Sequence, residues 1–249
     1  MKIKKYLIAA VFLLNGIVMS AATTIPIPKV TMGVGAAETP ADLVTSLQLL
    51  LMLTVLTLAP AIIMMTTSFV RVIIVLHFVR QALGLQQVPP NQVLVGLALF
   101  LTFFIMKPTY DDIMTNGINP FLEKKITQQQ MYSNVEAPLK KFMLKQTRTK
   151  DLELFLKLSK VAPPANRQEL PMNVVLPAFV VGEMTRGFEI GILIFIPFII
   201  IDMVVATILM SLGMMMLPPV SISMPFKLLL FVMVDGWSLI IDSLVRSFR

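Results

Sequence analysis

Cysteine is absent from this chain of 249 residues, histidine occurs once, and only 14% of the residues are charged. The lack of cysteine excludes disulfide bonds, thiol catalysis and cysteine-based zinc sites, and a single histidine excludes histidine-rich metal sites. The sequence contains no Walker A, HExxH or GxSxG pattern. We therefore expect no catalytic, cofactor-binding or metal-binding residues and no enzyme. Soluble domains carry about a quarter of charged residues, so the low charge is the strongest signal in the composition.

The charged residues are unevenly distributed along the chain. Residues 43–106 contain only Arg71 and Arg80, whereas residues 107–170 contain 18 of the 35 charged residues. Two apolar blocks therefore surround one polar insert, which is typical of a membrane protein. The insert shows two groups of apolar residues at i, i+3 and i+4, which predict that it is helical. These groups are Leu139, Phe142 and Met143, and Leu152, Phe155 and Leu156.

The first residues have the pattern of a targeting signal. Residues 1–22 combine three lysines, an apolar stretch and small residues before the end, which predicts a cleavable signal peptide; the alternative is a short uncleaved anchor. Residues 23–42 are rich in proline and glycine and predict a disordered leader. Cleavage would reduce the net charge of +7 to about +4, which is too weak and too dispersed for nucleic-acid binding.

Four apolar segments could cross a membrane, which requires about 20 helical residues. They are Leu43–Met65, Val93–Met106 and residues 188–217 and 226–245. The second segment is short, ends at Lys107-Pro108 and also suits a buried or re-entrant helix. We expect an all-α integral membrane protein in which residues 43–106 and 171–249 form kinked helical hairpins around a periplasmic insert, 107–170. Basic residues on the periplasmic side conflict with the positive-inside rule, so a simple four-span topology is doubtful.

Ionisable residues within the apolar segments are costly in lipid and should face protein or water. Glu183, Arg186 and Glu189 are three residues apart on one helical flank, where they could neutralise one another. Asp202 lies in the middle of the third segment and could relay protons, although a hydrogen bond to a neighbouring helix is the preferred interpretation. In the fourth segment, Asp235 begins a polar stripe, which continues through Ser238, Asp242 and Arg246.

Small and flexible residues suggest contacts between helices and one special loop. Two pairs of small residues four apart, Ala178/Gly182 and Gly187/Gly191, favour close helix contacts, which we expect in an oligomer. Met214, Met215 and Met216 follow Gly213 and precede two prolines. Methionine fills irregular space, so these three side chains either pack loosely or form a deformable ring when several copies assemble.

Several runs of the sequence resemble the FliP family of flagellar export-gate proteins. They are Arg80–Gln92, Gly96–Phe104, Phe142–Arg148, Leu176–Phe179, Gly213–Leu217, Pro225–Phe231 and Asp235–Trp237. The resemblance extends over Thr45–Phe248. It implies a pentameric ring that assembles with FliQ-like and FliR-like subunits in the bacterial inner membrane, at the flagellar basal body, and conducts unfolded flagellar proteins.

The resemblance also implies roles for particular residues. Met214, Met215 and Met216 would form the gasket of the pore. Independently of the resemblance, the polar or inter-subunit candidates are charged residues of the apolar segments: Glu183, Arg186, Glu189, Asp202, Lys227 and Asp235. Two alternatives remain: a homologue from a virulence secretion system, and a small-ion or proton carrier that uses Asp202 and the Glu183/Arg186/Glu189 group.

Overall fold

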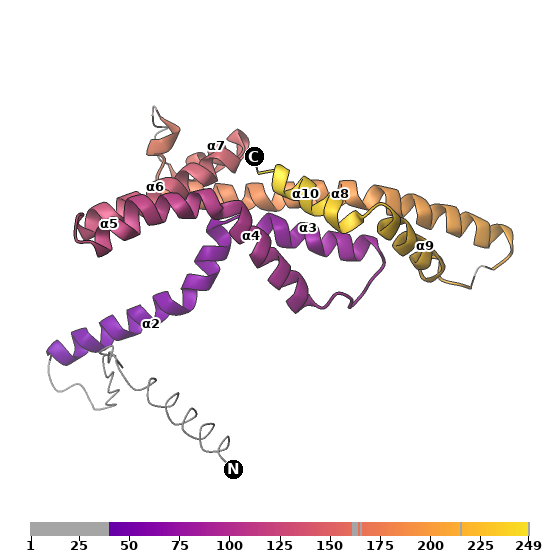
Figure 1. Cartoon of the computed structure of the whole chain (residues 1–249), viewed down its shortest axis with the longest axis horizontal. Helices are drawn as coiled ribbons and strands as arrows, with labels where there is room; N and C mark the ends of the chain where they lie inside the picture. Colours follow the sequence, from indigo (N-terminus) through magenta and orange to yellow (C-terminus); the bar gives the residue numbers. More distant parts are fainter. Residues whose placement is uncertain (1–39, 161–163, 165, 215, 249) are drawn as a thin grey trace, which may run out of the picture. The chain divides into compact units, whose positions relative to one another are not determined.

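The computed structural model describes residues 40–160, 164, 166–214 and 216–248 (Figure 1). The chain divides into two compact units, Met1–Leu51 and Met52–Arg249. The expected signal peptide, 1–22, and nearly all of the expected leader, 23–42, lie outside the described residues.

Every regular element within the described ranges is a helix (Figure 1). In chain order the elements are α2 (Pro40–Thr66), α3 (Phe69–Ala82), α4 (Asn91–Ile113), the π-helix η1 (Met114–Ile118), α5 (Asn119–Leu122), α6 (Gln128–Gln146), α7 (Thr149–Ser159), the 3-10 helix η2 (Arg167–Glu169), α8 (Met172–Ser211), α9 (Pro219–Met233) and α10 (Gly236–Arg246). Three helical stretches are long and apolar enough to cross a membrane: Ser46–Thr66, Asn91–Leu122 and Met172–Ser211. A fourth exists if α9 and α10, which are bent by 66°, count as one span. The prediction of an all-α membrane protein is thus confirmed.

Two of the apolar segments begin or end at residues other than those expected from the sequence. The second segment does not end at Lys107-Pro108, because α4 continues through both residues to Ile113. Lys107 Nζ lies 2.7 Å from the Asp111 carboxylate one turn later, and this i,i+4 pair supports the helix across the proline. The third segment is part of the longer helix α8, which begins at Met172 and contains Pro177 and Pro197.

α8 packs closely along α3 because two of its glycines face that helix. A Cβ atom on Gly187 would lie 2.9 Å from Ile74 Cγ2, and one on Gly191 would overlap the ring of Phe78. Small residues four apart allow two helix backbones to approach each other in this way. The glycines that suggested an oligomer contact are therefore used inside one chain, and Gly182 likewise faces Asp151 of α7.

α3 carries several of the completely buried apolar residues of the fold. Val72, Val75, Leu76 and Val79 are completely shielded from solvent. Residues of α4 and α10 pack against the first three of them, with Leu94 and Leu244 almost completely buried. Because these residues come from distant parts of the sequence, α3 organises the core of residues 52–249.

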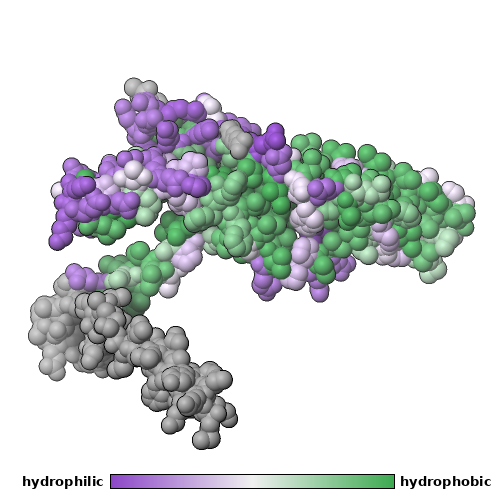
Figure 2. All heavy atoms as spheres, in the orientation of Figure 1, coloured by the Kyte–Doolittle hydropathy of each residue, from purple (hydrophilic) through white to green (hydrophobic). Residues whose placement is uncertain are grey.

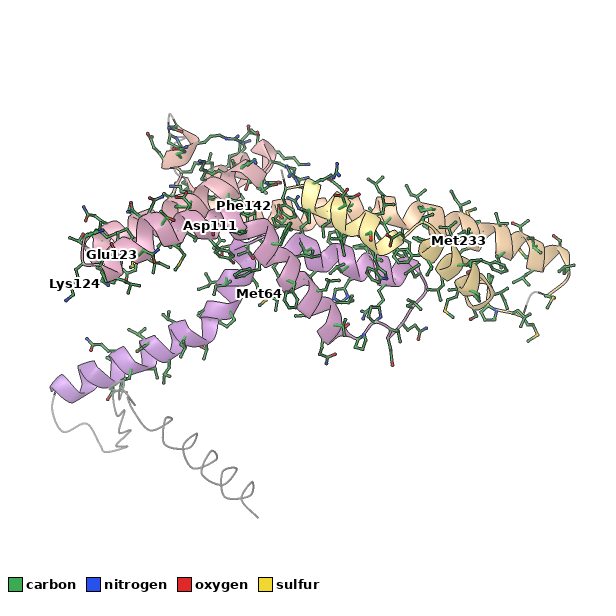
Figure 3. The ribbon with its side chains drawn as sticks, in the orientation of Figure 1. Met64, Asp111, Glu123, Lys124, Phe142 and Met233 are labelled. Atoms are coloured by element: carbon green, nitrogen blue, oxygen red, sulfur yellow. The ribbon has the colours of Figure 1, made fainter. Side chains whose placement is uncertain are left out.

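The polar insert folds as helices that cover the first third of α8. α6 begins with a capping box in which Thr127 and Gln130 satisfy each other's free backbone N–H groups. The two apolar groups of the insert pack against buried residues of α8, which include Val174 and Val175. The predicted helical insert is thus confirmed. Phe142, labelled in Figure 3, contacts the rings of both Phe179 and Phe248.

The second half of α8 leaves its apolar side chains uncovered. Figure 2 shows hydrophobic residues over α9 and the adjoining half of α8, and hydrophilic residues over α6 and α7. Exposed side chains on α8 include Ile192, Leu193, Ile196, Ile200, Met203, Val204 and Ile208. An apolar surface of this extent requires lipid or another protein chain against it.

Candidate functional site

A buried arginine, Arg71 of α3, joins four helical regions. Its Nη2 atom donates hydrogen bonds to Glu183 Oε1 on α8 and to Gln146 Oε1 on α6, the latter at 3.2 Å. Its Nη1 atom donates to the carbonyl and hydroxyl oxygens of Ser247, at 3.0 and 3.1 Å. The guanidinium carbon lies 3.8 Å from the ring centre of Phe248, in a cation–π contact. We call these five residues the arginine cluster.

The arginine cluster is closed to solvent within one chain. The side chains of Arg71 and Glu183 are 1% and 0% exposed. Buried charges are tolerated when they are paired and hydrogen-bonded. Gln146 extends the network, since its Nε2 atom donates to the Phe248 carbonyl at 2.9 Å and its Oε1 atom also accepts from Arg186, at 3.2 Å. The cluster therefore ties α3, α6 and α8 to the residues that follow α10.

A second charged cluster joins the other half of α8 to α9. Lys227 Nζ lies 2.6 Å from Asp202 Oδ2, and the Ser223 hydroxyl donates to Asp202 Oδ1. Lys227 also donates to the carbonyl of Ala82, at the end of α3, at 3.3 Å. The Lys227 side chain is 3% exposed and that of Asp202 is 27% exposed. We call Asp202, Ser223 and Lys227 the lysine cluster.

No ion pair between described residues joins Glu183, Arg186 and Glu189 to one another. Glu183 pairs with Arg71, whereas Glu189 lies 3.3 Å from Arg148, at the start of α7. Each residue finds a partner from a different helix because α8 is packed on that side by α3, α6 and α7. Arg148 is also bound to Asp151, and hydrogen bonding to this carboxylate raises the pKa of Arg148.

Asp235 lies at the bend between α9 and α10 instead of within a helical stripe. Its backbone is left-handed, with φ of 49°, and its side chain makes no capping hydrogen bond. α10 begins at Gly236, so the predicted polar stripe starts only after Asp235. Within α10, Arg246 pairs with Asp242 at 2.8 Å. Asp235 is exposed among apolar neighbours, which include Val232, Met233 and Val234.

The loop between α8 and α9 presents exposed apolar side chains. Gly213 has φ of 74°, which is suited to glycine and turns the chain after α8. Met216 is 99% exposed and Met214 is 44% exposed, while Met215 lies outside the described residues. Leu212 and Leu217 are also exposed. We call residues 212–217 the methionine loop.

Some residues of these clusters were not identified from the sequence. Arg71 was noted only as a charge, and Gln146, Ser223, Ser247 and Phe248 carried no prediction. One signal was present, since Arg71 is one of two charged residues in 43–106, and an isolated charge in an apolar segment needs a partner. The partner itself comes from α8, 112 residues later, and only the fold shows this pairing.

The fold and the clusters define a class of protein before any comparison. The described residues contain no group of three or more histidine, cysteine, aspartate or glutamate side chains that could hold a metal ion. Their charged residues in apolar helices are paired across helix contacts, and their largest apolar faces are exposed. These features define an α-helical membrane protein whose polar groups connect helices.

Comparison with known proteins then identifies the family. The sequence profile of the FliP family matches residues 52–244. The flagellar biosynthetic protein FliP of Bacillus subtilis is 52% identical over 213 residues, which cover 86% of this chain and 96% of that protein. The FliP proteins of Caulobacter vibrioides and Aquifex aeolicus are 50% and 47% identical over 89% and 90% of this chain, and over 82% and 92% of their own lengths. The chain belongs to the FliP family, whose members are components of the flagellar export apparatus rather than known enzymes.

Proposed function

We propose that the chain is a core subunit of the flagellar protein export gate. Copies of the chain form a ring, pentameric by resemblance to the family, and this ring assembles with FliQ-like and FliR-like subunits in the inner membrane at the flagellar basal body. Unfolded flagellar proteins pass through its centre. Residues 1–22 act as a cleaved signal, 23–42 as a leader, and the insert 107–170 lies on the periplasmic side.

The methionine loop is the observation that carries this proposal. Its described side chains Met214 and Met216 are exposed, and a Cβ on Gly213 would meet nothing within 4 Å. Exposed apolar side chains are costly in water unless other copies cover them. Because methionine side chains are flexible, loops from several copies could seal an empty pore and yield to a passing chain.

The exposed surface of α8 and α9 supports assembly with further subunits. An apolar groove of about 480 Å³ runs between the two helices. It is lined by Ile200, Ile201, Val204, Val205, Ile208, Leu209, Ile222 and Phe226. A groove lined only by aliphatic and aromatic side chains fits an apolar helix, which is the chemistry expected of a neighbouring membrane subunit.

Two other functions are less well supported. A small-ion or proton carrier needs ionisable groups that are free to exchange protons, whereas Asp202 and Glu183 are both held by cations. A virulence secretion homologue is disfavoured because the matching relatives are flagellar proteins.

Replacing the methionine loop tests the proposal. We expect Met214→Ala/Met215→Ala/Met216→Ala to increase the leak of small solutes through the assembled gate, while secretion of flagellar proteins is partly retained. The measurement is solute influx into cells that carry the complete export apparatus, together with secreted flagellin. The matched control replaces Met203, Met210 and Met233 by alanine, since these methionines are exposed but lie outside the loop.

The two variants separate the possible outcomes. An increased leak in the loop variant alone supports the gate. An unchanged leak in an apparatus that still assembles contradicts the gasket role, and equal leaks in both variants assign the effect to methionine content instead of the loop. An Asp202→Asn variant that assembles normally but abolishes all transport would favour the proton carrier.

A further inference from the structure

Asp235, at the bend between α9 and α10, carries a charge that its own chain leaves unpaired. The side chain is exposed and makes no ion pair or hydrogen bond with another described residue. Every other charged residue described within 69–106, 172–211 and 219–248 has a polar partner in the chain. Asp235 is therefore the exception among the charged residues of these apolar segments.

The backbone of Asp235 is held firmly, so the bend presents the carboxylate at a fixed place. The N–H group of Asp235 donates to the Val232 carbonyl, and its own carbonyl accepts from the Leu239 N–H, both at 3.1 Å. The residue that follows must be small, because a Cβ on Gly236 would overlap the Phe231 ring. Both backbone groups of Asp235 are thus bonded, and its side chain is left for a partner outside the chain.

The surface around this carboxylate is apolar. Val232, Met233 and Val234 before it and Leu239 after it are all exposed, and Met233 is labelled in Figure 3. Taken together, α9 and α10 are apolar enough to cross a membrane. A charged group in such a segment is costly in lipid and should face protein or water, whereas exposed apolar side chains favour contact with lipid or protein. A protein surface that is apolar and carries one cation satisfies both requirements.

The cation has to come from a chain of another kind. Each described arginine or lysine within 69–106, 172–211 and 219–248 is already bound to an acceptor in its own chain. The described lysines without a partner all lie in the polar insert, 107–170. A second copy therefore offers no unpaired cation from the described parts of these apolar segments.

We propose that Asp235 forms an ion pair with a lysine or arginine in an apolar helix of a different membrane subunit. This helix crosses the bend, covers Val232, Met233 and Leu239 with its own apolar side chains, and brings its cation to the carboxylate. Exclusion of water at the contact strengthens the attraction between the two charges. The inference rests on the proposed function, in which the chain assembles with FliQ-like and FliR-like subunits, and it names the chemistry of one contact in that assembly.

Co-purification of the full chain with both partner subunits tests this ion pair. We expect Asp235→Asn to reduce the recovery of one partner subunit by at least about tenfold, because the buried cation of that subunit loses its counter-ion. Asparagine readily adopts a left-handed backbone, so the bend should be retained. The matched control is Asp242→Asn on α10, since Asp242 is exposed but pairs with Arg246 of its own helix. This control should leave the recovery unchanged.

An exchange of charges identifies the partner residue. Asp235→Lys should abolish recovery of the same subunit, since two cations would then meet. Lysine is compatible with the backbone at this position, because Lys124 and Lys160 have φ of 57° and 54° in this chain. Each lysine and arginine in the apolar helices of that subunit is then replaced by aspartate in turn. One of these replacements should restore recovery with Asp235→Lys and reduce it with the unchanged chain.

The other outcomes overturn the inference, and they separate it from the proposed function. If Asp235→Asn recovers both subunits as well as the unchanged chain does, the carboxylate faces water or lipid headgroups. If only the contact between copies of the chain is lost, the cation belongs to a second copy. If the isolated Asp235→Asn chain unfolds at a lower temperature in detergent and no exchange restores recovery, Asp235 stabilises the bend. An unchanged chain that recovers neither subunit would contradict the proposed function itself.

Discussion

The arginine cluster and the lysine cluster both place an ion pair against α8, but they differ in how completely the chain encloses them. Arg71 and Glu183 are almost completely buried, and Arg71 also donates hydrogen bonds to Gln146 and Ser247, while Arg71 Nε and Glu183 Oε2 have no hydrogen-bond partner. In the lysine cluster, Ser223 donates to Asp202 and Lys227 also donates to the Ala82 carbonyl, but Asp202 remains 27% exposed. The comparison indicates that the charged group on the first half of α8, Glu183, is covered entirely by its own chain. On the second half, Asp202 remains partly accessible to solvent or to another chain.

The largest effect is expected when the arginine cluster loses its cation. Arg71→Met leaves the Glu183 carboxylate buried and unpaired, which should reduce the free energy of unfolding by about 3–5 kcal/mol. The measurement is denaturation of the full chain in detergent, monitored by the fluorescence of Trp237. The double variant Arg71→Met/Glu183→Met removes the unpaired charge and should recover much of the loss. A double variant that is no more stable than the single one would contradict the role of the buried charge.

A smaller effect is expected from the equivalent change in the lysine cluster. Lys227→Met leaves Asp202 with the Ser223 hydroxyl and partial access to solvent, so the loss should be about 1–3 kcal/mol. The same denaturation experiment measures it, and Asp202→Asn/Lys227→Met is the control that removes the remaining charge. If Lys227→Met costs more than Arg71→Met, burial does not set the ranking of the two clusters.

One added methyl group should disturb the contact between α3 and α8. The glycines of this contact lie between Glu183 and Asp202 in the sequence of α8. Gly191→Ala would overlap the Phe78 ring, and overpacking of this kind costs about 1–3 kcal/mol. Gly96→Ala in α4 is the matched control, because a Cβ there meets nothing within 4 Å. Alanine is the better helix former, so the control should be neutral or stabilise by about 0.5–1 kcal/mol. Equal effects in both variants would show that the close approach of α3 and α8 is unimportant.

The smallest effect is expected for the pH dependence of stability, through His77 of α3. Partial burial and the neighbouring Arg80 lower the pKa of His77 below 6.5. The Arg80 guanidinium lies 3.1 Å from His77 Nδ1, which fits a neutral ring that accepts this hydrogen bond. As the pH falls below about 6.5, the unfolded chain therefore binds a proton that the folded chain resists, and stability decreases.

His77→Gln should make stability less dependent on pH in this range. The change in slope should be well below the limit of about 1.4 kcal/mol per pH unit for one proton, because His77 is partly exposed to solvent. The measurement is denaturation of the unchanged chain and of the His77→Gln variant at pH values from about 7.5 to about 5. This range brackets the ordinary histidine pKa of about 6.5. A steeper slope in the variant would show that His77 is protonated more readily in the folded chain.

Much of the fold could be predicted because it depends on local patterns. The apolar spacing of Leu139, Phe142 and Met143 identified α6, and low charge with long apolar runs identified membrane-spanning helices. Helix limits were less accurate. Proline at 108 suggested an end, yet α4 continues beyond it, since a helix tolerates a proline when neighbouring turns and pairs such as Lys107–Asp111 support it.

The candidate residues of the site were identified more readily than their partners. Glu183, Asp202 and Lys227 were selected because charge is rare in apolar segments, and all three make ion pairs. Glu183 makes its ion pair with Arg71 on α3 and not with a neighbour on its own helix. Spacing along one helix shows which groups can meet on it, but not which side chain a second helix brings closer.

The sequence alone determined the class of this protein: a helical membrane chain without cysteine, with a polar insert and the motifs of the FliP family. These properties follow from composition and periodicity, which depend on residues close together in the chain. Only the tertiary structure decided that Arg71 closes a cluster with Glu183, Gln146 and Ser247, and that Gly187 and Gly191 serve α3 instead of another subunit. Such contacts depend on which distant helices pack together, because a buried charge or a close glycine contact is stable only with the partner that the whole fold supplies.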